Sequence, residues 1–316
     1  MKDKKKIYIL LSIAIFVILL FLFQGLNESN FKYNLYKRIP KVLAIILTGG
    51  AIAFSSIIFQ TITNNRILTP SILGLDALYG FLQTLAVFIF GASSIVMTNH
   101  KVNFIITMTL MILSTLILYK IMFKNGKNNI FFLLLVGTVL GTLFKSLSTF
   151  MQVLIDPNEF EALQGKLFAS FSNVNTDILL VVVIIMLLIF AFIYDDLKKL
   201  DVMLLGRDTS INLGIDYNKL SKKILLVVSV LVSISTALVG SITFLGLIVV
   251  NVSYEMFKTF KHSYLILGSM LISIIALVGG QFFVERILNY NSTVSIIINF
   301  IGGIYFIYLL LKENKR

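Results

Sequence analysis

Long, uninterrupted apolar runs are the dominant pattern in this sequence. Segments such as 7–23 and 178–194 are hydrophobic on every side and lack the apolar–polar alternation of a β-barrel strand. A helix needs about 20 apolar residues to cross a bilayer, and hydrocarbon supplies no water to satisfy an open backbone. The pattern therefore predicts an all-α, polytopic membrane protein.

Ten segments have the character of a membrane-spanning helix. They are 7–24, 39–60, 72–96, 102–122, 130–154, 178–194, 223–244, 246–257, 264–288 and 294–311. The eighth is short and directly follows the seventh at "GSITFLG", where Gly240 and Gly246 would permit a tight reversal. No small-residue cleavage site follows the first run, so we expect it to remain as an uncleaved helix.

The basic residues set the orientation of these helices. With a cytoplasmic N-terminus and ten spans, nineteen of the 27 Lys and Arg residues fall inside and seven fall outside. Cytoplasmic loops carry an excess of Lys and Arg. We therefore expect both termini in the cytoplasm and a single transmembrane domain over 1–316. The net charge of +12 is then explained by basic loops that set the orientation of the helices, and we expect no nucleic-acid partner.

The composition argues against a soluble enzyme, because only 13% of the residues are charged, against about a quarter in soluble domains. The chain has no Cys, and its two histidines, His100 and His262, lie far apart in the sequence. It also lacks the G-x-x-x-x-G-K-[ST] loop that holds nucleotide phosphates. We expect no catalytic residue, no metal ligand and no cofactor bound by this chain.

Few ionisable groups fall within the spans: Asp76, Lys145 and the pair Glu285–Arg286 at one end. Such groups are costly in a bilayer and are candidates for function. A proton-coupled carrier usually places carboxylates at mid-depth, and this chain nearly lacks them. A secondary transporter or channel for a small solute is therefore the alternative hypothesis.

A membrane-embedded enzyme acting on lipid is a third hypothesis. It would need acidic and His side chains clustered at the membrane surface. The richest acidic cluster, Asp156, Glu159 and Glu161, contains no His and no metal-like spacing. The sequence therefore disfavours this class.

Two hydrophilic segments are longer than ordinary hairpins: 155–177, expected outside, and 195–223, expected inside. The second has helix-starting residues, an apolar scatter, and Gly206 and Gly214 as breaks, which predicts two short helices. Because apolar side chains have little reason to face water, we expect this surface to meet a membrane or a protein partner. A loosely ordered basic loop is the alternative.

The second span carries small and polar residues that are candidates for a translocation path. Gly49, Ala53 and Ser56 fall on roughly one helix face, and the span closes with polar groups. These polar groups are Gln60, Asn64 and Asn65. Small residues also let helices pack closely, and the polar groups could equally cap the helix at the interface, so both interpretations stay open.

Three stretches together resemble the FecCD family of ABC-importer permeases, which carry iron–siderophores, haem and cobalamin. They are "RIPKVLAIILTGGAIAFSSIIFQTITNNRILTPSILGLDALYG" (38–80), "LLGRDTSINLGIDYNKL" (204–220) and "VGSITFLGLIVVN" (239–251). Arg66 replaces a family proline, and Val250 and Asn251 replace a Pro-His pair. These departures indicate a divergent branch of the family. That branch resembles the permeases that carry catecholate or hydroxycarboxylate siderophores.

The resemblance implies a multi-pass permease of the cell membrane that moves an iron chelate. Its partners would be a second permease, identical or paralogous, two ATP-binding subunits that hold the ATP, and an external substrate-binding protein. The implied coupling segment, about 197–221, contacts the ATPase through Leu204, Leu205, Gly206, Arg207, Asp208, Leu213 and Gly214. The implied docking residues for the binding protein are Arg38, Lys41 and Arg286. Interfacial snorkelling of Arg38 and Lys41 toward lipid headgroups is the alternative.

Overall fold

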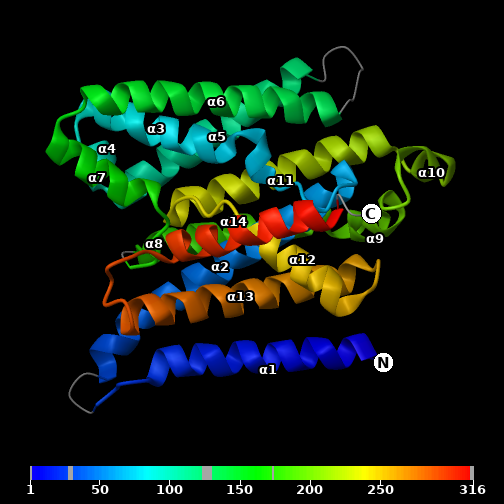
Figure 1. Ribbon diagram of the computed structural model, residues 1–316, viewed down its shortest axis with the longest axis horizontal. Helices are drawn as coiled ribbons and strands as arrows, with labels where there is room; N and C mark the ends of the chain where they lie inside the picture. The colour runs from blue at the N-terminus through cyan, green and yellow to red at the C-terminus, as the bar shows by residue number, and fades with distance from the viewer. Residues whose placement is uncertain (1, 28–30, 123–129, 173, 314–316) are drawn as a thin grey trace.

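The computed structural model describes residues 2–27, 31–122, 130–172 and 174–313 (Figure 1). Ten principal helices form over this part of the chain, in agreement with the ten predicted spans. They are α1 (Lys2–Phe23), α2 (Phe31–Thr63), α3 (Leu75–Phe90), α5 (His100–Met122), α6 (Ile130–Leu154), α8 (Thr176–Ile193), α11 (Tyr217–Val239), α12 (Leu245–Phe257), α13 (His262–Arg286) and α14 (Val294–Glu313). Eight are long and apolar enough to cross a membrane, and α3 and α12 are shorter.

Short helices lie at the two ends of the bundle. At one end, to the left in Figure 1, are α4 (Ile95–Thr98) and α7 (Pro157–Leu167). At the other are α9 (Leu197–Met203) and α10 (Arg207–Asn212), beside both chain termini. We refer to these as the α7 end and the α9 end. An even number of crossings requires both termini on one side, as observed.

Helix α2 is the centre of the bundle. It is buried along most of its length and packs against α8, α11, α12 and α13. Small residues allow this close approach. A Cβ atom placed on Gly49 would lie 2.7 Å from Oγ of Ser273 on α13, and one on Gly246 of α12 would overlap the Ser56 side chain.

The two glycines predicted at the reversal before α12 have different roles. Gly240 has a φ angle of 101°, a left-handed conformation that permits the chain to turn after α11. The expectation for Gly246 is wrong, because this residue lies inside α12 and its missing side chain makes room for α2. Helix approach, rather than backbone conformation, accounts for glycine there.

Irregular segments precede α3 and α12, and other parts of the protein cover both segments. Before α3, the 3₁₀-helix η1 (Pro70–Leu73) and Gly74 lie against the backbone of α6 at Gly137 and Gly141. Before α12, the Ser170 amide donates to the Val239 carbonyl at 2.8 Å. Non-helical backbone is tolerated at membrane depth where protein covers it in this way.

The contact between α2 and α12 generates a stability prediction. We expect Gly246→Val to destabilise the protein by about 1–3 kcal/mol, because the new methyl groups overlap the Ser56 side chain. The matched control is Gly303→Val on α14, where an added Cβ meets no atom within 4 Å. Thermal stability in detergent, followed by size-exclusion chromatography of a fluorescent fusion, measures both variants. Equal stability of the two variants would contradict the packing assignment.

Candidate functional site

The segment at the α9 end folds as the two short helices expected from the sequence. Gly206 separates α9 from α10 and has a φ angle of 93°. The Ser210 hydroxyl, fully buried, lies 3.0 Å from the Val202 carbonyl and 2.6 Å from the Gly206 carbonyl. These contacts hold α10 against α9, so the segment is an ordered corner and the loosely ordered loop is excluded.

The two faces of this corner differ in polarity and burial. Leu200 and Met203 are fully buried against the bundle, whereas Leu205 and Leu213 are 59% and 60% exposed. The remaining residues predicted for ATPase coupling surround these two leucines. Leu204 and Gly206 are half-buried, and Arg207, Asp208 and Gly214 are exposed. A rigid corner that presents leucines to solvent is suited to docking against another protein.

A hydrogen-bond chain connects α9 to the central helix α2. The Asp201 carboxylate accepts from the backbone amide of His262 at 2.7 Å and lies 2.6 Å from its Nδ1 atom. The other ring nitrogen, Nε2, lies 2.8 Å from the Thr61 hydroxyl on α2. The ring donates its Nδ1–H to Asp201, and Nε2 is within hydrogen-bond distance of the Thr61 hydroxyl, which also donates to the Ile57 carbonyl at 2.9 Å. The carboxylate also lies at the positive end of α13.

Ion pairs fix the start of the corner to α11, and a hydrogen bond beside the corner joins α11 to α2. The carboxylate of Asp196, just before α9, is paired with Lys199 on α9 and with Lys223 on α11. The Tyr217 hydroxyl at the start of α11 donates to the Ile62 carbonyl of α2 at 3.0 Å. Helix α11 holds the corner through Asp196, and α9 also packs against α2 and α13, so the corner can transmit displacement to all three helices.

The residues predicted to dock a binding protein lie at the α7 end, but two of them are not free surface groups. Arg38 is 8% exposed, and its Nη1 donates to the carbonyls of Phe21, Leu22 and Gln24 at 2.8–3.2 Å. It thereby satisfies the carbonyl end of α1. The Arg38 charge terminates a helix in this structure, and its role in docking a binding protein stays a prediction.

Lys41 is also engaged inside the chain. Its ammonium lies 2.7 Å from the Glu285 carboxylate of α13, and both side chains are buried. Glu285 also accepts a hydrogen bond from Gln281 at 2.8 Å. Of the predicted docking set only Arg286 is exposed, with one Nη donating to the Gln24 carbonyl at 3.0 Å.

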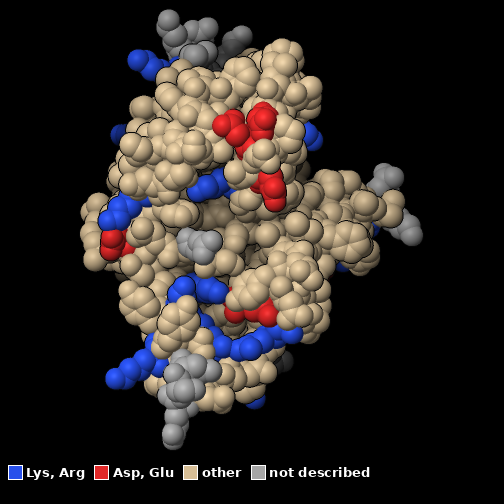
Figure 2. Space-filling view, turned by 90° about the vertical axis from the view of Figure 1, so that its left-hand side faces the viewer, with Lys and Arg blue, Asp and Glu red and all other residues tan. Residues whose placement is uncertain are grey.

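Figure 2 looks onto this α7 end of the molecule. Lys and Arg side chains cross the middle and lower half of the face, and acidic side chains gather near the top, on the side of α7. A hollow of about 290 Å³ opens here and is lined in part by His100, Asn103, Lys166 and Asn175. Burial lowers the pKa of the Lys166 ammonium. The face combines both signs of charge around a polar recess.

The residues proposed for a translocation path lie in the packed interior. Gly49, Ala53 and Ser56 are buried where α2 meets α12 and α13, so helix packing is the correct interpretation of this stripe. Gln60 is 2% exposed, and neither polar atom of its amide has a hydrogen-bond partner among the described residues.

The two asparagines after α2 form a turn. Asn64 is exposed and has a φ angle of 48°, and the Asn65 side chain accepts from the Ile67 amide at 2.8 Å. They end α2 as its C-terminal turn. A translocation path along this stripe stays a prediction.

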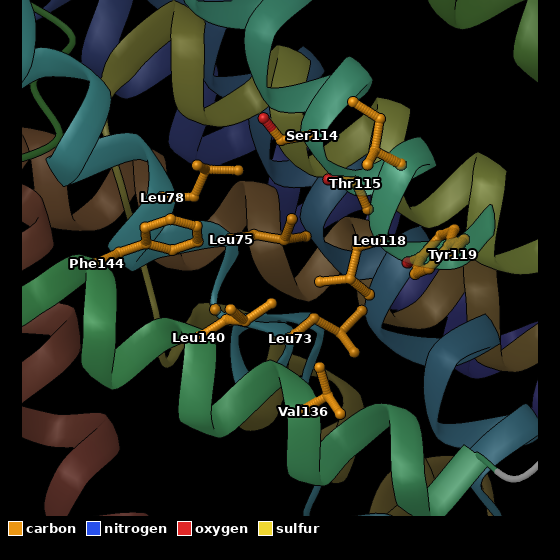
Figure 3. Close-up of a pocket in the computed structure, with 12 residues that line it drawn as sticks. Leu73, Leu75, Leu78, Ser114, Thr115, Leu118, Tyr119, Val136, Leu140 and Phe144 are labelled. Carbon is orange, nitrogen blue, oxygen red and sulfur yellow. The ribbon is translucent and has the colours of Figure 1, made fainter. Parts of the chain in front are cut away.

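A second cavity, of about 230 Å³, lies between α3, α5 and α6 (Figure 3). Leu73, Leu118, Leu140 and Phe144 contribute to a lining that is almost entirely apolar. It contains no ionisable group other than the Tyr119 phenol. A charged chelate would not be stable in such a cavity, because no group there compensates its loss of hydration.

Comparison with known proteins agrees with this architecture. The chain is 61% identical over 315 residues to the petrobactin import system permease protein YclO of Bacillus subtilis, covering 100% of this chain and 99% of that protein. It is 34% identical to the petrobactin import system permease protein FatC of Bacillus anthracis, over 92% of this chain and 82% of the relative.

A solved structure of an inward-facing, metal-chelate type ABC transporter has the same fold. Its TM-score is 0.84, at 22% identity over 98% of this chain and 99% of that chain. The sequence model of the FecCD transport family matches residues 7–312, nearly the whole chain. On this match and the identity to YclO and FatC, the chain belongs to the FecCD transport family and is a permease subunit of an ABC importer.

Proposed function

We propose that this chain carries a ferric siderophore of the petrobactin class across the cell membrane into the cytoplasm. The observation that carries the proposal is the 61% identity to YclO, which extends over the whole length of both chains. It therefore includes the α9–α10 corner as well as the helices of the bundle. A permease that differed in cargo would be expected to diverge more over the membrane-spanning part.

The proposal assigns the α9 end to the cytoplasm. Most Lys and Arg residues lie at this end under the charge rule, as do both termini in Figure 1. Two ATP-binding subunits would dock there on Leu205 and Leu213, and ATP would be bound and hydrolysed on those subunits. The α7 end would face outward and receive the substrate-binding protein, with exposed Arg286 as a contact. A second permease, identical or paralogous, would complete the path.

Coupling follows from the contacts of the α9–α10 corner. Closure of the ATP-binding subunits would displace the leucine surface of this corner. Because Asp201 holds His262 and His262 holds Thr61, the displacement would reach α13 and α2 together. A single domain whose central helix is buried along most of its length would then move as packed units rather than deform locally.

Uptake of radioactive iron tests the proposed cargo. Cells lacking the chromosomal copy should regain ATP-dependent uptake of ferric petrobactin when this chain is expressed with its partner subunits. Restored uptake should disappear when the phosphate-binding lysine of the partner ATPase is replaced. Uptake that persists with the altered ATPase would contradict the proposal. So would a wild-type chain that reaches the membrane without restoring uptake.

The leucine surface generates a second prediction. Leu205→Asp should lower uptake at least about tenfold and release the ATP-binding subunit during purification, because a carboxylate cannot be buried at an apolar contact. The matched control is Ile95→Asp, which alters an exposed apolar residue at the opposite end. Both variants should reach the membrane in equal amounts. Normal co-purification and uptake of Leu205→Asp would show that ATPase docking lies elsewhere.

A further inference from the structure

Lys145 is an ionisable residue in the middle of a membrane-spanning helix. It lies fifteen residues after the start of α6 and nine residues before its end at Leu154. Its side chain is exposed on the surface of the chain. Among the described residues, no carboxylate lies within ion-pair distance of its ammonium. The structure therefore leaves a positive charge uncompensated at membrane depth.

Snorkelling does not account for this position. At about 1.5 Å per residue, Lys145 lies about 14 Å from the nearer end of α6. A Lys side chain reaches about 6 Å, so its ammonium would stay within the hydrocarbon layer if it faced lipid. A charge at that depth costs several kcal/mol, and such residues generally face a water-filled cavity or a bundle interior.

The surroundings of Lys145 on α6 are polar on one side only. Thr138, Thr142 and Thr149 lie seven residues before, three before and four after it, on the same helix face, and all three are exposed. The face of α6 beside these threonines is apolar and also exposed, and it includes Val139 and Phe150. Each threonine hydroxyl donates to a carbonyl of α6 itself, so the lysine charge is the group that requires water or an anion.

This polar stripe adjoins the packed face of α6. Gln152, one turn beyond Thr149, donates to the Thr84 hydroxyl of α3 at 3.2 Å. The stripe thus lies at the border between the α3–α6 contact and the exposed apolar face. An apolar strip beside a polar stripe is the pattern expected where a second helix bundle covers the first and leaves an aqueous path at its margin.

We infer that Lys145 and the threonine stripe line the aqueous path, and that Lys145 attracts the anionic ferric chelate at mid-membrane. The inference rests on the proposed function, and it names the residue that would select the charge of the cargo. Iron(III) held by catecholate and hydroxycarboxylate groups has a negative metal centre, because the ligand charges outnumber the three charges of the metal. One fixed lysine provides attraction without binding so strongly that release is prevented.

Water exposure of the stripe is testable without any transport assay, because the chain contains no Cys. Single Lys145→Cys and Thr142→Cys variants, in the complex with its partner subunits, are treated with a charged thiol reagent in open membrane fragments. We expect both to react, as should the variant Asn158→Cys at the exposed start of α7. Leu187→Cys on the apolar helix α8 should stay unreactive. An unreactive Cys at 145 would overturn the inference, whether lipid or a neighbouring permease covers it.

Charge selection is tested by uptake of an anionic ferric catecholate at limiting concentration. Lys145→Gln should lower the rate about tenfold, equivalent to about 1.4 kcal/mol, Lys145→Glu should lower it further, and Lys145→Arg should keep most of it. Lys4→Gln, which removes a charge at the N-terminus of α1, should transport normally. Wild-type rates in Lys145→Gln would overturn this inference alone, whereas failure of the wild-type chain would overturn the proposed function.

Discussion

Hydrocarbon does not solvate a peptide group or a charge, and under that constraint the helix ends and irregular segments of this protein are satisfied or covered by other parts of the chain. The carbonyl end of α1 is closed by Arg38, whose guanidinium serves three carbonyls at once. The irregular backbone before α3 is covered by the glycine pair of α6, and the segment before α12 bonds to the loop after α7. Short helices are possible at membrane depth because these contacts replace water.

The same constraint gives the α9–α10 corner its rigidity. Asp201 and Asp196 are both used to join helices, the first to α13 and the second to α11. The corner is consequently held on one side by charged and polar contacts and presents leucines on the other. A partner bound to the leucines would act on α2 through His262, which is 1% exposed, and through the packing of α9 against α2. Packed interiors transmit such displacements because they have little free volume.

Much of this architecture could be predicted from the sequence. Apolar runs identified the ten helices, and the glycines at 206 and 214 indicated two short helices before the structure placed them. Those features are local, so a pattern within one segment is sufficient to specify them. The family resemblance, which depends on three separated motifs, is likewise confirmed by the match to residues 7–312.

The errors in the sequence analysis concern contacts between distant segments. The charge rule indicates the side of the membrane on which Arg38 and Lys41 lie, but it contains no information on whether a carbonyl cluster or Glu285 neutralises them. The spacing of Gly49 and Ser56 indicates a close helix contact without identifying the helix. His262 was set aside as an isolated histidine, since its partners lie 61 and 201 residues away.

The central claim is that Asp201, His262 and Thr61 act as one connection between ATP hydrolysis and the central helix. The direct measurement is the number of chelate molecules transported per ATP hydrolysed by the purified complex in liposomes. It compares wild type, Asp201→Ala, Thr61→Val and the double variant. Each single change should lower this ratio, and the double variant should be no worse than the more severe single one, because both break the same connection. Unchanged ratios, or losses that add in the double variant, would contradict the account.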